Sequence, residues 1–516
     1  MLESYLWVTV FFAGLATMAV EFAASRLLGN VFGTSNLVWA VVIGLILVYL
    51  TLGNWLGGRW ADQKPETGRF FTIVASAGVA TALIPLLSRW LLQQAANAFD
   101  ALNLPILIST FLMVLVLLSV PVTLLGTVTP FTLKLLLHDS ATSGRTAGRL
   151  SALATLGSFI GTFLTVLVLI PAIGTYRTFL AVALLLFLMA LPGLWMARKR
   201  LLSIIFSICA IIVVLLLATG VQGSIKTTQN QVYEGESAYN YIQVIEEDGY
   251  RFLRLNEGQG MQSIWHPTEL FYGGPWSQFL LTPLFSSSSD AVSKVSDIAI
   301  LGLAGGTTAR QASVVYPQAQ VDGWEIDPKI IRVGVQWFGM DLPNLEAHAE
   351  DARWGIAHSP KEYDIVAIDA YRPPYIPPHM VTVEFFREVC DHLKPNGGIA
   401  INVGRSPSDR SLVTSLSRTV AEVFPNVFVT DLPDSYNSII FASKNPDTGW
   451  AYFEQNIEYL EEDSQSILLQ AGRKAIEGKA VTQLSGEVFT DDRAPIEAIT
   501  NRMVLNFLIS GGINEK

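Results

Sequence analysis

Long apolar stretches dominate the first 220 residues of the chain. A helix needs roughly 20 apolar residues to cross the hydrocarbon core of a bilayer. The first stretch lacks the basic leading region of a signal peptide and further stretches follow it, so we interpret it as a span. The pattern predicts an all-α transmembrane bundle over residues 1–222. Its seven spans are expected at about 5–25, 37–58, 70–92, 104–126, 150–172, 175–196 and 201–220.

The pattern changes near residue 230. The sequence YNYIQVIEEDGYRFLRLN predicts two short strands joined by the turn Asp248-Gly249, so we expect a small antiparallel sheet within 228–296. From residue 297 onward apolar runs alternate with helical segments, which predicts a doubly wound, Rossmann-like α/β domain over 297–516. The expected parallel strands are DIAILGL, QVDGWEI, YDIVAID and GIAINVG, and the expected helices lie near 307–316, 328–339, 383–393 and 408–422.

Composition and charge sharpen this division. Apolar residues make up 51% of the chain and charged residues 15%, whereas soluble domains carry about 25% charged residues. Residues 1–220 hold 12 Lys/Arg and 6 Asp/Glu, and the remainder holds 22 and 38. The acidic balance of the second part excludes a nucleic-acid partner, because phosphate contacts need clustered Lys and Arg.

Basic residues mark the cytoplasmic loops of membrane proteins. Three clusters follow the second, fourth and sixth spans, and single arginines lie on the other side. This predicts a multi-pass protein of the cell (inner) membrane with its N-terminus inside, and seven spans then place the α/β domain outside. One miscounted span would reverse that side, and we expect irregular backbone between Pro121 and Pro130. The clusters are Arg59, Lys64, Arg69; Lys134, Arg145, Arg149; and Arg198, Lys199, Arg200, and the single residues are Arg26, Arg89 and Arg177.

Two features inside the predicted bundle have competing interpretations. Gly53 and Gly57 lie four residues apart and Gly58 follows, a pattern that favours close helix packing. Glu21 lies within the first span, with Arg26 five residues on. A carboxylate in lipid must be paired or must line a wet cavity. Glu21 is therefore either half of a structural ion pair near the helix end or part of a cation or polyamine path.

A glycine-rich loop follows the first strand of the α/β domain. Gly302, Gly305 and Gly306 allow backbone to approach a ligand closely at the start of the next helix. The second strand ends in Glu325, 23 residues after Gly302. An acidic residue at about this spacing accepts the hydroxyl protons of a ribose diol. Together the loop and the carboxylate predict a nucleoside site.

Two further aspartates follow strands of the same domain. Asp351-Ala352 comes after a short third strand, where an adenine edge would be read, and Asp369 ends the fourth strand beside a Pro-fixed loop. Each also has a structural interpretation, since Glu325 and Asp351 suit helix N-caps and Asp369 suits a loop cap. Flavodoxin-like and dinucleotide-binding domains are the alternatives for the fold. Neither the two cysteines, Cys209 and Cys390, nor the six histidines show metal-ligand spacing, so we expect no metal.

Residues 237–444 resemble the spermidine synthase, or aminopropyltransferase, family. The glycine loop with Arg310, the run Glu325-Ile326-Asp327, and Asp351-Ala352 resemble family motifs. So do Asp369 with Pro373, Glu269 with Tyr272, the run Leu393, Pro395, Gly397 and Gly398, Tyr436, and Ser443-Lys444. The first span and the glycine-rich second span are similar to the multi-span segment fused to such domains in some bacterial proteins.

The resemblance implies a methyltransferase-like fold and decarboxylated S-adenosylmethionine as cosubstrate, with no permanently bound cofactor. It implies catalytic roles for Asp369 and Tyr272, and an acceptor side formed by Asn240, Arg372, Pro373 and Tyr436. The chain departs from the family pattern at several positions. Gly305 and Arg372 replace family aspartates, Asn240 replaces a glutamine, and Gly273 follows the tyrosine.

These departures leave three hypotheses. The first is a membrane-bound aminopropyltransferase of polyamine biosynthesis that acts on a small amine. The second is a methyltransferase using intact S-adenosylmethionine, with Gly305 leaving room for the methionyl group and Arg372 meeting its carboxylate. The third is a polyamine or cation transporter with a nucleoside-sensing domain, which would need Glu21. The expected partners are the lipid bilayer and the small-molecule amine, and a homodimer is left open.

Overall fold

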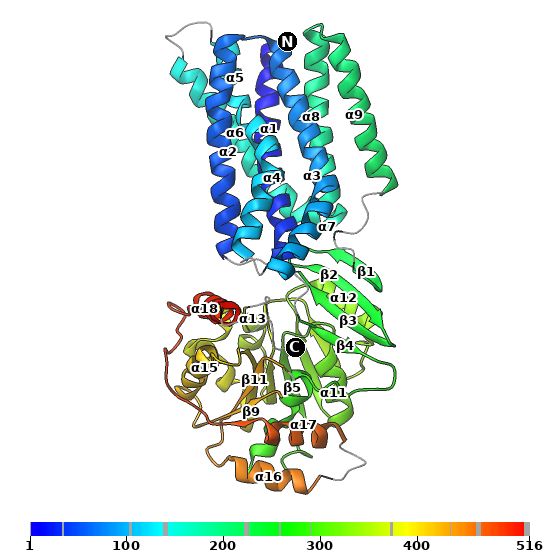
Figure 1. Cartoon of the computed structure of the whole chain (residues 1–516). Helices are drawn as coiled ribbons and strands as arrows, with labels where there is room; N and C mark the ends of the chain where they lie inside the picture. Colours follow the sequence, from blue (N-terminus) through cyan, green and yellow to red (C-terminus); the bar gives the residue numbers. More distant parts are fainter. Residues whose placement is uncertain are drawn as a thin grey trace. The chain divides into compact units, whose positions relative to one another are not determined.

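The structure is a computed structural model that describes residues 2–32, 36–102, 106–137, 143–220, 225, 228–256, 260–288, 290–371, 375–433, 435–460 and 466–509. The chain divides into two compact units (Figure 1). The first comprises residues 1–229 and 234–241, and the second comprises residues 230–233 and 242–516.

The first unit is a bundle of long helices. Among the described residues, seven helices are long and apolar enough to cross a membrane, which agrees with the seven predicted stretches. Their outward faces are apolar, since Trp195 is 70% exposed and Leu201 is 71% exposed. The helices are α1 (Leu2–Phe32), α2 (Asn36–Gln63), α3 (Thr67–Leu102), α4 (Ile106–Gly126), α5 (Val128–Leu136), α6 (Ser143–Phe163), the π-helix η2 (Leu164–Leu169), α7 (Ile170–Ile173), α8 (Thr175–Met196) and α9 (Arg200–Thr219).

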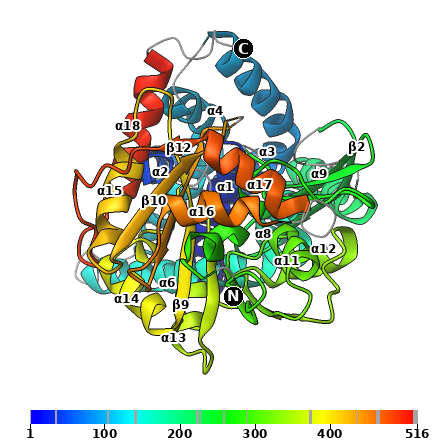
Figure 2. The ribbon, with the colours of Figure 1, turned by 90° about the horizontal axis from the view of Figure 1, so that it is seen from below.

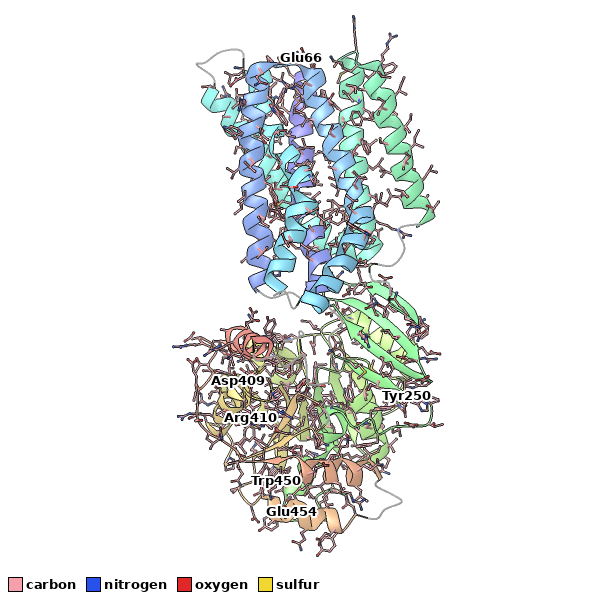
Figure 3. The ribbon with its side chains drawn as sticks, viewed as in Figure 1. Glu66, Tyr250, Asp409, Arg410, Trp450 and Glu454 are labelled. Atoms are coloured by element: carbon pink, nitrogen blue, oxygen red, sulfur yellow. The ribbon has the colours of Figure 1, made fainter. Side chains whose placement is uncertain are left out.

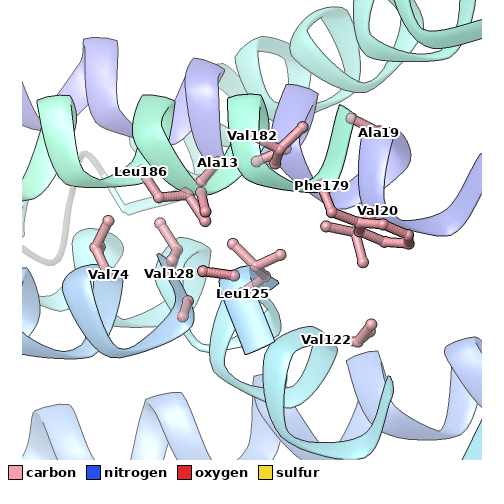
Figure 4. Packing of buried hydrophobic residues seen from close by; sticks show 14 of the residues in the cluster. Ala13, Ala19, Val20, Val74, Val122, Leu125, Val128, Phe179, Val182 and Leu186 are labelled. Carbon is pink, nitrogen blue, oxygen red and sulfur yellow. The ribbon is translucent and has the colours of Figure 1, made fainter. Parts of the chain in front are cut away.

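Glycines bring pairs of these helices together. A Cβ at Gly53 would lie 2.3 Å from the carbonyl oxygen of Thr123, and one at Gly57 would lie 2.6 Å from that of Thr127. Helix packing is therefore the role of these two glycines, whereas a Cβ at Gly58 would meet nothing within 4 Å. A Cβ at Gly157 would lie 2.0 Å from a carbonyl oxygen of α1. Between these contacts, apolar side chains of α1, α3, α4 and α8 converge on a common core (Figure 4).

The segment between Pro121 and Pro130 is irregular, as expected. Pro121 remains inside α4, but the helix ends at Gly126 and α5 begins at Val128. At the break the Thr127 hydroxyl donates to the Leu124 carbonyl oxygen, 2.7 Å away. The side chain therefore compensates locally for helical hydrogen bonds lost at the break.

A buried carboxylate ties the hairpin 234–241 to the helices of the first unit. Glu236 is only 8% exposed and accepts hydrogen bonds from the backbone N–H and the hydroxyl of Thr175, each at 2.5 Å. Thr175 is the first residue of α8, so Glu236 satisfies backbone that a helix N-terminus leaves unpaired. Arg26 lies 3.9 Å from Glu236 and donates to the carbonyl oxygens of Ser237 and Tyr239.

The Glu21–Arg26 pair interpreted as a structural ion pair is not formed. Arg26 pairs with Glu236 instead, and within the described residues Glu21 makes no hydrogen bond or ion pair. The five-residue spacing explains this, since helix neighbours that face each other are three or four apart.

A small sheet and a large sheet follow the helices in the chain. The strands β1 (Gln231–Glu236), β2 (Tyr241–Glu247), β3 (Tyr250–Leu255) and β4 (Ser263–Trp265) follow one another in the small sheet. The predicted turn joins β2 and β3, with positive φ at Asp248 and Gly249, the backbone that two-residue hairpins favour. Buried residues of β2 and β3 pack against one helix of the large domain.

The large sheet has eight strands in the order β12-β10-β11-β9-β8-β5-β6-β7. Its first five strands in chain order are parallel, and β11 is antiparallel to both neighbours. The order reverses between β5 and β8, which is where ligands bind in open α/β sheets. The strands are β5 (Asp297–Leu301), β6 (Gln320–Trp324), β7 (Leu345–His348), β8 (Tyr363–Ile368), β9 (Leu393–Gly404), β10 (Asn426–Asp431), β11 (Asn437–Ser443) and β12 (Lys479–Ala480).

Helices cover both faces of this sheet, because alternate residues of its strands are apolar on both sides. Ala299 and Leu301 of β5 belong to one core, and Ile298 and Ile300 belong to the other. Figure 2 shows α13, α14 and α15 on one side of the strands and α11 and α17 on the other. The helices are α10 (Pro275–Gln278), the 3₁₀ helix η3 (Phe279–Phe285), α11 (Thr307–Val315), α12 (Pro328–Trp337), α13 (Ala352–Ala357), the 3₁₀ helix η4 (Pro378–Met380), α14 (Val383–Asp391), α15 (Ser411–Ala421), α16 (Trp450–Glu458), α17 (Ser466–Glu477) and α18 (Ile496–Ile509).

Candidate active site

The glycine-rich loop connects β5 to α11. Gly302 has φ +99°, and a Cβ there would lie 2.6 Å from backbone atoms of Asp369. The absence of a side chain at Gly302 therefore allows the backbone at the end of β5 to contact the backbone at the end of β8. Gly306 has φ +83° and is the residue before α11. Ala304 also has positive φ, and this turns its N–H toward the next strand.

Glu325 follows β6 and receives that N–H. Its Oε2 accepts from the backbone N–H of Ala304 at 3.0 Å, and its Oε1 accepts from that of Asp327 at 3.1 Å. Burial raises the pKa of Glu325 to about 7. Each carboxylate oxygen retains a further lone pair, so the group can still accept two hydroxyl protons. Asp327, and not Glu325, caps α12.

Asp351 is the N-cap of α13, one of the two interpretations of its sequence position. Its Oδ1 accepts from the backbone N–H of Arg353 and of Trp354, both at 3.0 Å. Its Oδ2 lies 3.0 Å from Nε2 of His379, and this hydrogen bond lowers the pKa of Asp351. A hydrogen bond of 3.0 Å from the N–H of Glu325 to the carbonyl oxygen of His348 joins the ends of β6 and β7. Glu325 and Asp351 therefore follow neighbouring strand ends.

Asp369 follows β8 at the centre of this edge. Its backbone N–H donates to the Leu301 carbonyl oxygen at 2.9 Å, and its Oδ1 accepts from Nδ2 of Asn402 at 2.9 Å. Burial raises the pKa of Asp369 to about 7, although the Asn402 hydrogen bond opposes the rise. A carboxyl group with this pKa exchanges protons near neutral pH, which is the property of a general base.

Asn402 also links Asp369 to the predicted acceptor side. Its Oδ1 accepts from Nδ2 of Asn437 at 2.6 Å, and Asn437 follows Tyr436 in the chain. Tyr436 is 49% exposed and packs edge-on against Phe507. Sequence reasoning missed Asn402 and Asn437. The sequence did indicate Asn402, because it is a polar residue within the apolar strand GIAINVG.

Tyr272 is not brought to Asp369 by any hydrogen bond between described residues. Its hydroxyl donates to the carbonyl oxygen of Glu269 at 2.7 Å and accepts from the N–H of His266 at 3.2 Å. The Glu269 carboxylate in turn accepts from the hydroxyl of Tyr250, which is labelled in Figure 3. Tyr272 therefore stabilises its own loop, and its expected catalytic role stays a prediction.

A pocket of about 410 Å³ opens beside Tyr272. Gly273 lines this pocket together with Lys474. The missing side chain leaves room for the lysine, since a Cβ at Gly273 would lie 3.0 Å from Nζ of Lys474. The departure from the family pattern at this position thus admits a lysine of α17. The lining residues are Tyr250, Phe252, Ile264, Phe271, Tyr272, Gly273 and Lys474.

The space expected at Gly305 is not vacant. A Cβ there would lie 3.0 Å from Cβ and Oγ of Ser263 and 3.2 Å from Phe338. The Ser263 hydroxyl also accepts from the Gly305 N–H at 2.8 Å. The expectation that Gly305 leaves room for a methionyl group is therefore wrong, because Ser263 of β4 and Phe338 close the direction in which a side chain would extend.

Three predicted site residues are not brought into this arrangement by a described contact. Asn240 belongs to the hairpin of the first unit, where its carbonyl oxygen accepts from the N–H of Ser237 at 2.9 Å. Arg372 and Pro373 lie outside the described residues. Asp322, Glu346 and His348 approach one another closely enough to hold a cation. However, Nζ of Lys361 already lies 2.9 and 2.8 Å from the two Asp322 oxygens, so we assign no metal there.

Comparison with known proteins identifies enzymes of similar sequence. A "Probable polyamine aminopropyl transferase" of Bifidobacterium longum is 30% identical over 286 residues, which cover 52% of this chain and 62% of the relative. A "Polyamine aminopropyltransferase" of Vibrio vulnificus is 27% identical over 220 residues, covering 41% and 71%. The chain is similar in sequence to polyamine aminopropyltransferases. It spans less than two thirds of the first of these two relatives.

Other comparisons are weaker. The human "eEF1A lysine and N-terminal methyltransferase" is 27% identical over 161 residues, which cover 29% of this chain and 23% of that relative. A spermidine synthase structure from Thermotoga maritima is 19% identical, covers 49% of this chain and 84% of its own, and has a TM-score of 0.38. No family model matches the chain. The curated relatives named here are thus all transferases.

Proposed function

We propose that this chain is a membrane-bound aminopropyltransferase. It would transfer the aminopropyl group of decarboxylated S-adenosylmethionine to a small amine, as the names of its relatives suggest. The observation that carries the proposal is Asp369, a carboxyl with a pKa of about 7 that adjoins the glycine loop at the topological switch point. The loop lies beside Asp369, and Glu325 and Asp351 follow the ends of the next strands along the sheet, β6 and β7.

The reaction assigns a role to each residue. Glu325 binds the ribose diol, Asp351 and Ala352 bind the adenine edge, and Gly302 to Gly306 hold the sulfonium tail. The amine nitrogen attacks the carbon next to sulfur, the carbon–sulfur bond breaks, and neutral methylthioadenosine leaves. Asp369 accepts the proton that the amine loses. Because the leaving group is already activated, positioning supplies most of the acceleration.

The membrane assignment rests on the helical unit. The helices α2, α3, α4, α6, α8 and α9 expose large apolar side chains, and a lipid bilayer is the environment that such faces require. We place the protein in the cell membrane as a multi-pass protein. The side of the α/β unit follows only from the basic loops, which favour the exterior.

An activity assay of the full chain tests the proposal. The purified protein is incubated with decarboxylated S-adenosylmethionine and a panel of amines that includes putrescine, and products are identified by mass spectrometry. The Asp369→Asn variant should lose about 10² to 10⁴ in rate, the usual contribution of general-base catalysis. Asp391, an exposed aspartate at the end of α14, is the matched control for the same change. No aminopropylated product with any amine would refute the proposal.

The second candidate is a methyltransferase that uses intact S-adenosylmethionine. The methyltransferases among the relatives favour it, as does the absence of the family aspartates at Gly305 and Arg372. The family resemblance implies that these carboxylates face the donor, and a site without them would repel the methionyl carboxylate less. Competition binding of the two donors to the full chain distinguishes the candidates. Strong preference for the decarboxylated donor would exclude the methyltransferase.

A further inference from the structure

The C-terminal segment 489–493 is fixed against the start of α14. Phe489 is fully buried, and its carbonyl oxygen accepts from the N–H of Val383 at 2.9 Å. The N–H of Asp491 donates to the Glu384 carboxylate at 3.0 Å, and the Asp491 Oδ1 accepts from the Thr382 hydroxyl at 2.7 Å. This segment lies beyond residues 237–444, which hold the motifs of the family resemblance.

Asp491 binds the guanidinium of Arg353 in a bidentate manner, through both terminal nitrogens. Nη1 donates to Oδ1 at 2.7 Å, and Nη2 donates to Oδ2 at 2.9 Å. Nε and Nη2 of Arg353 also donate to the two oxygens of Glu388, at 2.8 and 2.7 Å. The fifth N–H donates from Nη1 to the carbonyl oxygen of His379 at 2.8 Å. All five donors of the planar fork are thus engaged, an arrangement that lysine cannot reproduce.

Groups linked to this network contact both carboxylate oxygens of Asp351. Arg353 lies two residues after Asp351, and its own backbone N–H caps onto the Asp351 Oδ1. His379, which receives the guanidinium at its carbonyl oxygen, places its ring nitrogen 3.0 Å from the Asp351 Oδ2. Displacement of the Arg353 side chain therefore disturbs two of the three groups that contact the carboxylate of Asp351, the third being the N–H of Trp354.

We infer that Asp491, acting through Arg353, is a positioning residue that sets selectivity for a 6-amino purine. The inference rests on the proposed function, in which Asp351 accepts a hydrogen bond from the adenine amino group. A carboxylate accepts from an amino group but gains nothing from a 6-oxo group, so its orientation controls the preference between the two. The C-terminal segment thus contributes to the specificity of a site formed by residues far from it in the chain.

The test measures a ratio of affinities with the full chain. Methylthioadenosine and methylthioinosine, which differ at the purine 6-position, are titrated calorimetrically into wild type, Asp491→Asn, Arg353→Lys and Asp492→Asn. Asp492 is the matched control because it is exposed and makes no hydrogen bond or ion pair with a described residue. Wild type and Asp492→Asn should prefer the 6-amino compound. Asp491→Asn and Arg353→Lys should lower that preference roughly tenfold, the effect of about one hydrogen bond.

The ratio separates positioning from folding. A purely structural role of Asp491 would weaken both nucleosides equally and leave the ratio unchanged, and this result would overturn the inference. An unchanged ratio with unchanged affinities would overturn it as well, while the proposed function would stand. If wild type binds neither nucleoside, the proposed function itself fails and the inference fails with it.

Discussion

The hydrogen bond from Asn402 to Asp369 makes the pH dependence of the proposed reaction predictable. Burial raises the pKa of Asp369 to about 7, and the amide of Asn402 at 2.9 Å is the group that opposes the rise. A base must be ionised, so kcat/KM should increase with pH up to about 7 and then level off. Asn402→Leu removes the donor at similar volume and favours the neutral form of Asp369 further.

The size of the effect follows from the strength of that bond. A hydrogen bond to a charged group contributes about 1.5 to 3 kcal/mol, and one pKa unit corresponds to about 1.4 kcal/mol. The pKa of Asp369 in the variant should therefore lie between about 8 and 9. At pH 7 the ionised fraction falls from about one half to between about a tenth and a hundredth, so kcat/KM should fall roughly 5- to 50-fold. Near pH 10 the loss should almost vanish.

The assay is a kcat/KM profile between pH 5.5 and 10 for wild type, Asn402→Leu and a control. Asn396→Leu is the control because Asn396 is an exposed asparagine of the same strand. A loss in Asn402→Leu that is equal at every pH would show that the substitution acts by distortion. An acidic limb that stays near pH 7 would show that Asp369 does not set it, and either result refutes the reasoning.

Three further predictions concern other parts of the chain. Glu325→Gln should weaken methylthioadenosine binding by about 1–3 kcal/mol in calorimetry, and wild-type affinity should rise between pH 6 and 8 as a carboxyl with a pKa of about 7 ionises; unchanged affinity would remove Glu325 from the site. Gly157→Leu should lower the thermal unfolding midpoint in detergent because a Cβ would lie 2.0 Å from the Phe11 carbonyl oxygen, whereas Gly144→Leu, with nothing within 4 Å, should not; equal midpoints would contradict this packing. Reporter fusions after residue 225 should give active phosphatase and a dark fluorescent protein, because the basic loops predict an exterior α/β unit. The opposite pattern would mean that the span count is wrong and would place the α/β unit in the cytosol with its cosubstrate.

The parts of the site that the sequence made predictable are those that parallel strands determine. Glu325 lies 21 residues after Ala304 of the glycine loop, yet the N–H of Ala304 reaches the Glu325 carboxylate. The prediction succeeded because the ends of neighbouring parallel strands must share one edge. The apolar helices were predictable for a similar reason, since their length and composition are local properties.

Contacts between distant side chains were not predictable in this way. Arg353 and Asp491 lie 138 residues apart, and no periodicity relates them. The surroundings of Gly305 could not be predicted for the same reason. Gly305 suggests open space from sequence alone, but Ser263 of β4 fills it. The helices α16 to α18 carry only weak local signals, and they follow the part of the chain that resembles a family.

The hairpin 234–241 determines whether the chain can be divided into its two units at a single point. It belongs to the helical unit, while both flanking segments belong to the α/β unit, so the chain passes between the units at 229/230, 233/234 and 241/242. A recombination at any one of these points would separate Glu236 from Thr175 and Arg26 or would divide the hairpin from its strands. A fragment starting at residue 228 would carry a carboxylate whose buried partners are gone. No single cut at one of these points therefore yields two complete units.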